Sequence, residues 1–152
     1  CINKNIHISE MIHLVQLPEH LKESPYLNMG YSRNEFFVYN VYRWYHGYFD
    51  HNPANLLPRP QQEVQSEVFS LIGEPDIVIK RAKELLAKDQ AQLGLQVLDV
   101  LLQAKPENVP ARQLRVKLLE KLGADDTCLM SRNSWVYFIE RDKEFLKSKG
   151  VN

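Results

Sequence analysis

The residues with the most potential for chemistry lie in the stretch HGYFDHN, from His46 to Asn52. Imidazole and carboxylate groups bind Zn²⁺ in proteins and also serve as general acids and bases. His46, Asp50 and His51 would supply three ligands of a metal site, and the neighbouring sequence offers no obvious fourth. No Gly-rich phosphate loop, G-x-S-x-G elbow or cysteine–histidine pair accompanies them. An independent enzyme built on the Asp50–His51 pair is therefore the least favoured hypothesis.

The same stretch has a structural interpretation. Asp50 and Asn52 are of the types that form turns and caps, and a residue before proline avoids the helical region. Pro53, Pro58 and Pro60 then keep the chain extended. These residues predict a rigid exit from a helix.

The remaining histidines and the cysteines do not suggest a site. His7, His13 and His20 lack the i, i+4 spacing of a zinc-binding helix and are predicted to be solvated. Cys1 and Cys128 lie at opposite ends of the chain, so they predict neither a disulfide framework nor a metal knuckle. We expect no catalytic residue, metal ligand or cofactor in this chain.

Composition excludes two classes of partner. Nineteen basic residues balance nineteen acidic ones among 152, which leaves no net field to attract nucleic acid. No apolar run approaches the length of a membrane span, so we expect a soluble protein without a membrane span. The chain begins with cysteine rather than methionine and is interpreted as a fragment, which leaves its localisation unknown.

Helical periodicity dominates the chain and no segment shows sustained alternation, which predicts an all-α, multi-helix fold with antiparallel helix hairpins. We expect residues 1–32 to form an extended N-terminal arm, with a short helix starting at Ser9, and residues 33–150 to form the helical domain. Later helices are predicted at 61–72, 75–88, 91–104, 108–122 and 132–147. Arg132 and Asn133, beside Trp135, form a polar cluster at the predicted start of the last helix, where capping and interface hydrogen bonds are expected.

The segment 33–49 predicts a helix that is apolar around much of its circumference. Such a helix needs covering on several sides, and aromatic side chains with polar tips are enriched at interfaces. It is interpreted either as a central core helix or as one shared with a subunit interface. The interface candidates are Phe36, Phe37, Tyr39, Trp44 and Tyr48.

Residues 82–119 loosely resemble one tetratricopeptide helix pair, which suggests a different function. A peptide-binding module with a concave groove is the alternative hypothesis, and Arg112, Arg115 and Lys117 would supply its charged face. Against it, one repeat cannot form a solenoid.

The stretch GYFDHNPANLLPRP resembles the signature of the alkyl sulfatase dimerisation domain. The signature positions are Gly47, Phe49, Asp50, Asn52, Pro53, Ala54, Leu56 and Pro58. The resemblance extends to YSRNEFFVYNVYRWYHGYFD before it, and to QLGLQVLDVLLQAKPENVPARQLRVKLLEKLG and SRNSWVYF after it. His51 stands where glycine is common in the family, and Tyr48 where tryptophan is common.

The resemblance implies a non-catalytic homodimerisation module of an alkyl-sulfatase-like zinc hydrolase. In that family the module lies between a metallo-β-lactamase-like catalytic domain, which would bind zinc, and a sterol-carrier-like domain. Residues 1–32 resemble the linker that leaves the catalytic domain. The resemblance also implies that the loop after the aromatic helix approaches that domain, where Tyr45, Tyr48 or His51 would reach a substrate.

Overall fold

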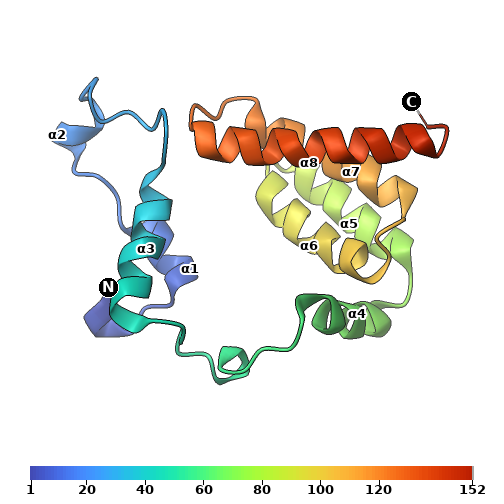
Figure 1. Cartoon of the computed structure of the whole chain (residues 1–152), viewed down its shortest axis with the longest axis horizontal. Helices are drawn as coiled ribbons and strands as arrows, with labels where there is room; N and C mark the ends of the chain where they lie inside the picture. Colours follow the sequence, from blue (N-terminus) through green and yellow to red (C-terminus); the bar gives the residue numbers. More distant parts are fainter. Residues whose placement is uncertain (152) are drawn as a thin grey trace. The chain divides into compact units, whose positions relative to one another are not determined.

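The computed structural model describes residues 1–151, and the chain divides into two compact units. Unit 1 comprises residues 1–58 and 127–130, and unit 2 comprises residues 59–126 and the chain from Ser131 onward. The described residues form helices, turns and loops without a β-strand (Figure 1). The predicted all-α class is therefore confirmed. The boundary between the two units lies after Pro58, whereas the sequence placed the start of the helical domain at residue 33.

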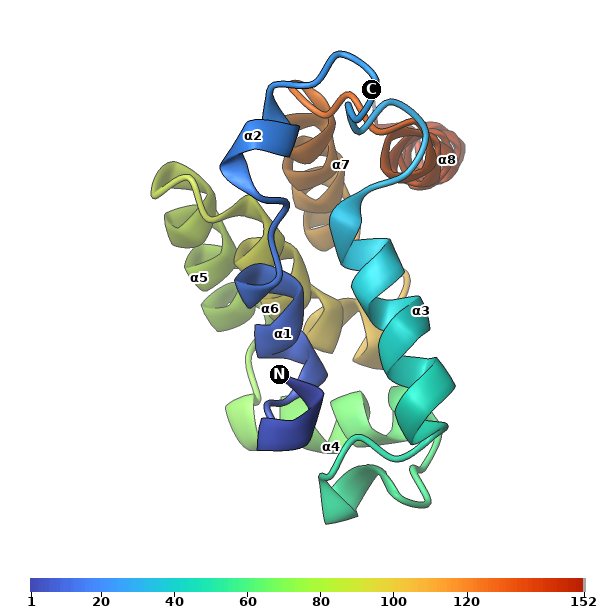
Figure 2. The ribbon, with the colours of Figure 1, turned by 90° about the vertical axis from the view of Figure 1, so that its left-hand side faces the viewer.

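Unit 1 is built around α3, the helix Asn34–His46. The short helix α1 (Ile8–Leu14) packs beside it, as Figure 2 shows. The other elements of this unit are η1 (Ile2–Lys4), α2 (Glu19–Lys22) and η2 (Pro53–Asn55). The predicted N-terminal arm thus contains three short helical elements, and one of them covers part of α3.

The core of unit 1 is small. Its buried cluster consists of Ile8 and Met11 from α1 together with Val38 and Tyr42 from α3. The backbone N–H groups of Leu129 and Met130 donate to carbonyls of residues 30 and 31, at 2.9 and 3.2 Å, and attach residues 127–130 to this unit. A cluster of four buried side chains is small for a unit of this length, and apolar burial supplies most of the stabilisation of a fold.

Unit 2 has the larger core, with helix α6 (Ala91–Ala104) at its centre. This helix packs against α4 (Gln61–Ile72), α5 (Pro75–Ala87) and α7 (Val109–Gly123). Gly94 allows α6 to lie close to both α5 and α7. A Cβ atom there would lie 3.0 Å from Leu118 Cδ2 and 3.2 Å from the carbonyl oxygen of Ala82. Helices α4 to α7 match the predicted spans to within one residue, because proline or glycine marks most of their ends.

Helix α8 (Leu129–Ser148) is attached to α7 by a buried ion cluster. The Asp142 carboxylate has no exposed surface and accepts hydrogen bonds from Arg112 Nη1, Arg115 Nε and Arg115 Nη2, each at 2.6 Å. The Arg112 guanidinium also lies 4.2 Å from the centre of the Phe145 ring. Two guanidinium groups therefore satisfy one buried carboxylate.

Helices α7 and α8 correct two sequence interpretations. Arg112 and Arg115 are engaged by Asp142 and do not form a free charged face for a peptide. Helix α8 begins at Leu129, three residues before the predicted start. Arg132 and Asn133 therefore lie within the helix, exposed, and do not cap it. Trp135 is half-buried against the second apolar cluster of unit 2.

Candidate functional site

Helix α3 presents an uncharged aromatic face to solvent. Phe37, Val41 and Trp44 follow one another at i, i+4 and i+7, which places them on one side of a helix. Phe37 is 62% exposed, Trp44 87% and the neighbouring Tyr45 71%. Large contiguous apolar patches of this kind mark interaction sites on soluble proteins.

The five interface candidates do not all lie on this face. Successive residues of a helix are offset by about 100°, so Phe36 and Tyr39 point to other sides of α3 than Phe37 and Trp44. Phe36 is half-buried and Tyr39 is 42% exposed. Tyr48 follows the helix end and is also highly exposed. Val38 and Tyr42 point toward α1 and are buried against it.

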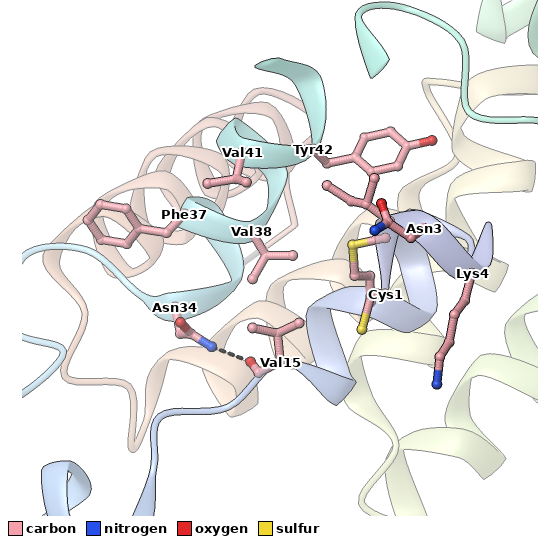
Figure 3. Close-up of a pocket in the computed structure, with 11 residues that line it drawn as sticks. Cys1, Asn3, Lys4, Val15, Asn34, Phe37, Val38, Val41 and Tyr42 are labelled. Carbon is pink, nitrogen blue, oxygen red and sulfur yellow. Dashed lines mark hydrogen bonds between the residues drawn. The ribbon is translucent and has the colours of Figure 1, made fainter. Parts of the chain in front are cut away.

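A groove runs along the border between α1 and α3, with a volume of about 670 Å³ (Figure 3). Phe37, Val38, Val41 and Tyr42 form its α3 side, while Met11 and Val15 belong to the opposite wall. The Asn34 amide donates a hydrogen bond to the Val15 carbonyl and closes one end. Lys4, from η1, is the one charged residue among the described residues that line the groove. Sequence periodicity did not reveal this groove because it requires α1 to lie on α3.

The loop after α3 is held by hydrogen bonds within unit 1. Gly47 ends the helix with φ 67° and ψ −123°, and its N–H donates to the Arg43 carbonyl at 2.9 Å. Asn52 caps the short helix η2 by accepting from the Ala54 N–H at 3.1 Å. Pro53, Ala54, Leu56 and Pro58 of the family signature are exposed, and Phe49 is half-buried. The predicted rigid exit from the aromatic helix is therefore present.

We expect Gly47→Ala to destabilise unit 1. A Cβ at this position meets no atom within 4 Å, so the cost arises from the backbone conformation alone. A residue with a side chain in such a region loses about 1–3 kcal/mol. Hydrogen exchange of the α3 amides measures this change. Gly123→Ala, inside a helix and with room for a methyl group, is the matched control and should not lower stability. Unchanged exchange in Gly47→Ala would contradict the expectation.

Asp50 joins this loop to the N-terminal arm. Its carboxylate accepts from Asn55 Nδ2 at 2.6 Å and from the Asn52 N–H at 2.9 Å, and lies 3.4 Å from His7 Nε2. These hydrogen bonds, first from Asn55 and then from Asn52, hold the pKa of Asp50 below its ordinary value. The His7 side chain is 41% exposed, and its ring also caps α1 by accepting from the Ser9 N–H.

Two histidines lie beside this cluster. His51 Nε2 is 3.0 Å from His46 Nδ1, and the His46 ring stacks on Tyr42 with 4.6 Å between ring centres. One of the two nitrogens donates this hydrogen bond and the other accepts it. Asp50 pairs with His7 and His51 with His46, so the hypothetical Asp50–His51 catalytic pair is not formed in the described structure. Burial, together with the negative charge of Asp50, raises the pKa of the Tyr42 hydroxyl.

His51 occupies an unusual backbone position. Its φ of 67° lies in the left-handed region, which favours glycine. This geometry gives a physical reason why glycine would suit the position of His51. The histidine keeps the conformation while its ring contacts His46 and Phe49.

Asp50→Asn should change the acid dependence of stability. A carboxylate whose pKa is lowered by folding stabilises the fold fully above its unfolded pKa, near 4, and this contribution is lost as pH falls through the lower folded value. We therefore expect the wild type to exceed Asp50→Asn in stability at pH 6, and the difference to shrink below about pH 4. Urea unfolding across this pH range measures the difference. Glu23→Gln, an exposed carboxylate of the same unit, is the control; a difference that stays constant with pH contradicts the argument.

The described residues offer no cluster of three or more histidine, cysteine, aspartate or glutamate side chains that could bind a metal ion. Likewise, none of the helices in the part of the chain that the structure covers is long and apolar enough to span a bilayer. The prominent features of unit 1 are thus the aromatic face of α3, the groove between α1 and α3, and the loop after α3 that hydrogen bonds hold in place. This arrangement favours association with another surface.

Comparison with known proteins connects these features with a family. A family model described as alkyl sulfatase dimerisation matches residues 7–143. An (R)-specific secondary-alkylsulfatase of a Pseudomonas species is 30% identical over 136 residues, which cover 89% of this chain and 20% of that protein. A linear primary-alkylsulfatase of Pseudomonas is 31% identical over 123 residues, covering 80% of this chain and 18% of that protein.

Solved structures support the same assignment. The stereoselective inverting sec-alkylsulfatase Pisa1 from Pseudomonas superimposes with a TM-score of 0.86 and 29% identity, over 93% of this chain and 23% of that one. The chain spans about a fifth of the length of the curated relatives it matches. The signature loop, the aromatic helix before it and the helices after it are those of the alkyl sulfatase dimerisation domain, the family to which this chain belongs.

Proposed function

We propose that this chain is the module through which an alkyl-sulfatase-like hydrolase forms its homodimer, by burying the aromatic face of α3. The observation that carries the proposal is the contrast within unit 1. Its buried cluster has four residues, while Phe37, Val41, Trp44 and Tyr45 remain open to solvent. A unit with more exposed than buried aromatic surface gains stability when that face is covered, and obligate dimers often lack a stable folded monomer.

Self-association also fits the chemistry of this face. Interface cores are depleted in charge and enriched in tyrosine, tryptophan and phenylalanine, and most homo-oligomers are two-fold symmetric dimers. A face without charged groups can meet its own copy without like-charge repulsion. The tetratricopeptide alternative is not favoured, since the arginines that would have formed its charged face are paired with Asp142.

The remainder of the parent protein is proposed from its relatives. Since the relatives are named as alkylsulfatases, we propose that the parent hydrolyses alkyl sulfate esters. A zinc ion would activate water there in a metallo-β-lactamase-like domain from which residues 1–32 lead, and a sterol-carrier-like domain would follow. The described residues contain no cluster of three or more side chains that could bind a metal ion, and the proposal assigns no catalytic step to them.

The molar mass of the chain, measured by light scattering over a concentration series, tests the dimer. We expect a mass that rises from the 17.8 kDa of one chain to twice that value as concentration increases. A stable interface should bury at least about 1,200 Å² in total. A mass that remains at one chain up to millimolar concentration would contradict the proposal.

A role for the loop in substrate binding stays a separate prediction. Tyr45, Tyr48 and His51 are exposed in the described structure, so each is available to a neighbouring domain. Alanine at each position in the parent enzyme, with the dimer mass checked in parallel, tests this role. Unchanged turnover in an intact dimer would exclude it.

A further inference from the structure

The exposed face of α3 has a defined centre. Successive residues of a helix are offset by about 100°, which places Val41 in the middle of the face. On one side of Val41 lie Phe37 and Trp44. On the other side lie Asn34, Val38 and Tyr45. The second side borders the groove, whose wall Asn34 and Val38 help to form (Figure 3). The first side carries the two most apolar exposed rings of this helix.

These positions are self-complementary under one symmetry. In an antiparallel pair of identical helices related by a two-fold axis, each residue faces the residue equally far beyond the axis on the other copy. With the axis at Val41, the turn that carries Phe37 and Val38 faces the turn that carries Trp44 and Tyr45 of the second copy. The axis also keeps each side of the helix facing the equivalent side of its copy. Trp44 of the second copy therefore meets Phe37, and Tyr45 of the second copy meets Val38.

We propose that α3 pairs antiparallel with α3 of a second copy about a two-fold axis at Val41, so that the groove between α1 and α3 receives Tyr45 of that copy. This inference rests on the proposed homodimer and specifies its surface and register. Trp44 of each copy packs on Phe37 of the other, an aromatic pairing of the kind that stabilises interfaces. The Tyr45 ring fills apolar space beside Val38, Val41 and Met11. Its hydroxyl end lies near the groove rim, where Asn34 supplies a polar side chain.

The absence of charge on this face favours a second copy over a charged partner. Asn34, Phe37, Val38, Val41, Trp44 and Tyr45 carry no charge. Lys4 is the one charged residue among the described residues lining the groove, and it lies on η1, away from the α3 stripe. Identical lysines on two copies therefore do not meet at the axis, and no ion of opposite sign is needed to cover the face.

Cysteine crosslinking distinguishes this register from others. Packed helices lie 8–10 Å apart and their Cα atoms lie about 2.3 Å from each axis, so two residues at the crossing have Cα atoms up to about 5.4 Å apart. That distance suits a disulfide. The test uses the full chain with Cys1→Ser, because Cys1 is an exposed free thiol. Val41→Cys in this background should form a disulfide-linked dimer on mild oxidation.

Two matched variants serve as controls. Tyr45→Cys lies near the same face but four residues further, so the two cysteines are about 12 Å apart along the helices, too far for a disulfide. Tyr39→Cys is exposed on another side of α3. We expect Val41→Cys to crosslink at least tenfold faster than either. Efficient crosslinking of Tyr45→Cys would indicate a parallel pair, and that of Tyr39→Cys a different face; each result overturns the proposed register.

Light scattering of the Cys1→Ser chain distinguishes a wrong register from a failure of the dimerisation function itself. If this chain is a dimer and Val41→Cys fails to crosslink, the register is wrong while the dimerisation function stands. If the chain is monomeric at all concentrations, the dimerisation function fails and the register fails with it. Circular dichroism of each variant shows whether the helices are intact.

Discussion

Asp142→Ala is expected to lower the free energy of unfolding of this protein by about 3–5 kcal/mol. The carboxylate is completely buried and forms ion pairs with both Arg112 and Arg115, which are only 18% and 19% exposed. Removal of Asp142 leaves the two guanidinium groups without the acceptor of three hydrogen bonds. Uncompensated buried charge is among the most destabilising changes known. Guanidinium unfolding followed by circular dichroism measures the loss.

The effect should depend on burial and not on the removal of any carboxylate. Glu140→Ala changes an exposed acidic residue two positions earlier on α8, and surface substitutions of this kind stay within about 0.5 kcal/mol. Replacing Asp142 and both arginines together by apolar residues of similar size should recover much of the stability, because buried ion clusters are often no better than apolar packing. A loss below about 1 kcal/mol in Asp142→Ala would show that water or a rearranged side chain replaces the carboxylate.

Trp44→Ala is expected to weaken the homodimer at least 30-fold. Tryptophan at the centre of an interface commonly contributes 2 kcal/mol or more on truncation, and 1.4 kcal/mol corresponds to a factor of ten. Because Trp44 is 87% exposed in one chain, its removal takes little from the core of unit 1. Analytical ultracentrifugation of the variant and the wild type gives the two dissociation constants.

The control for this variant is another exposed apolar residue outside the face. Leu71 on α4 is also 87% exposed, and Leu71→Ala should change the dissociation constant less than threefold. The helical content of Trp44→Ala should equal that of the wild type. A wild-type dissociation constant in Trp44→Ala would mean that the dimer uses a surface other than the aromatic face of α3.

The helices of unit 2 illustrate what local sequence is able to predict. Pro75 begins α5, Gly73 ends α4 and Asn108 caps α7 by accepting from the Ala111 N–H at 2.9 Å. Each of these effects acts within one helical turn, so the residue type is sufficient to locate it. The signature loop is also local, which is why its turn and cap residues were identified correctly.

The end of α3 shows the limit of periodicity. The apolar pattern continues to Phe49, and the sequence therefore predicted a helix to that point. Gly47 ends the helix with a backbone conformation that favours glycine. Phe49 lies beyond the helix end, where its carbonyl accepts a hydrogen bond from the Tyr42 hydroxyl at 3.4 Å. An aromatic run does not indicate by itself whether its residues share a helix.

What the sequence established alone is the helical class, most helix boundaries, the signature loop and the abundance of aromatic residues on α3, because each depends on residue type and short-range spacing. The tertiary structure decided which of those aromatic residues are buried. It also brought His7 to Asp50 and joined Asp142 to two arginines about thirty residues away. These contacts join segments that are distant in the chain. They form only when the helices pack, and local sequence patterns do not specify that packing.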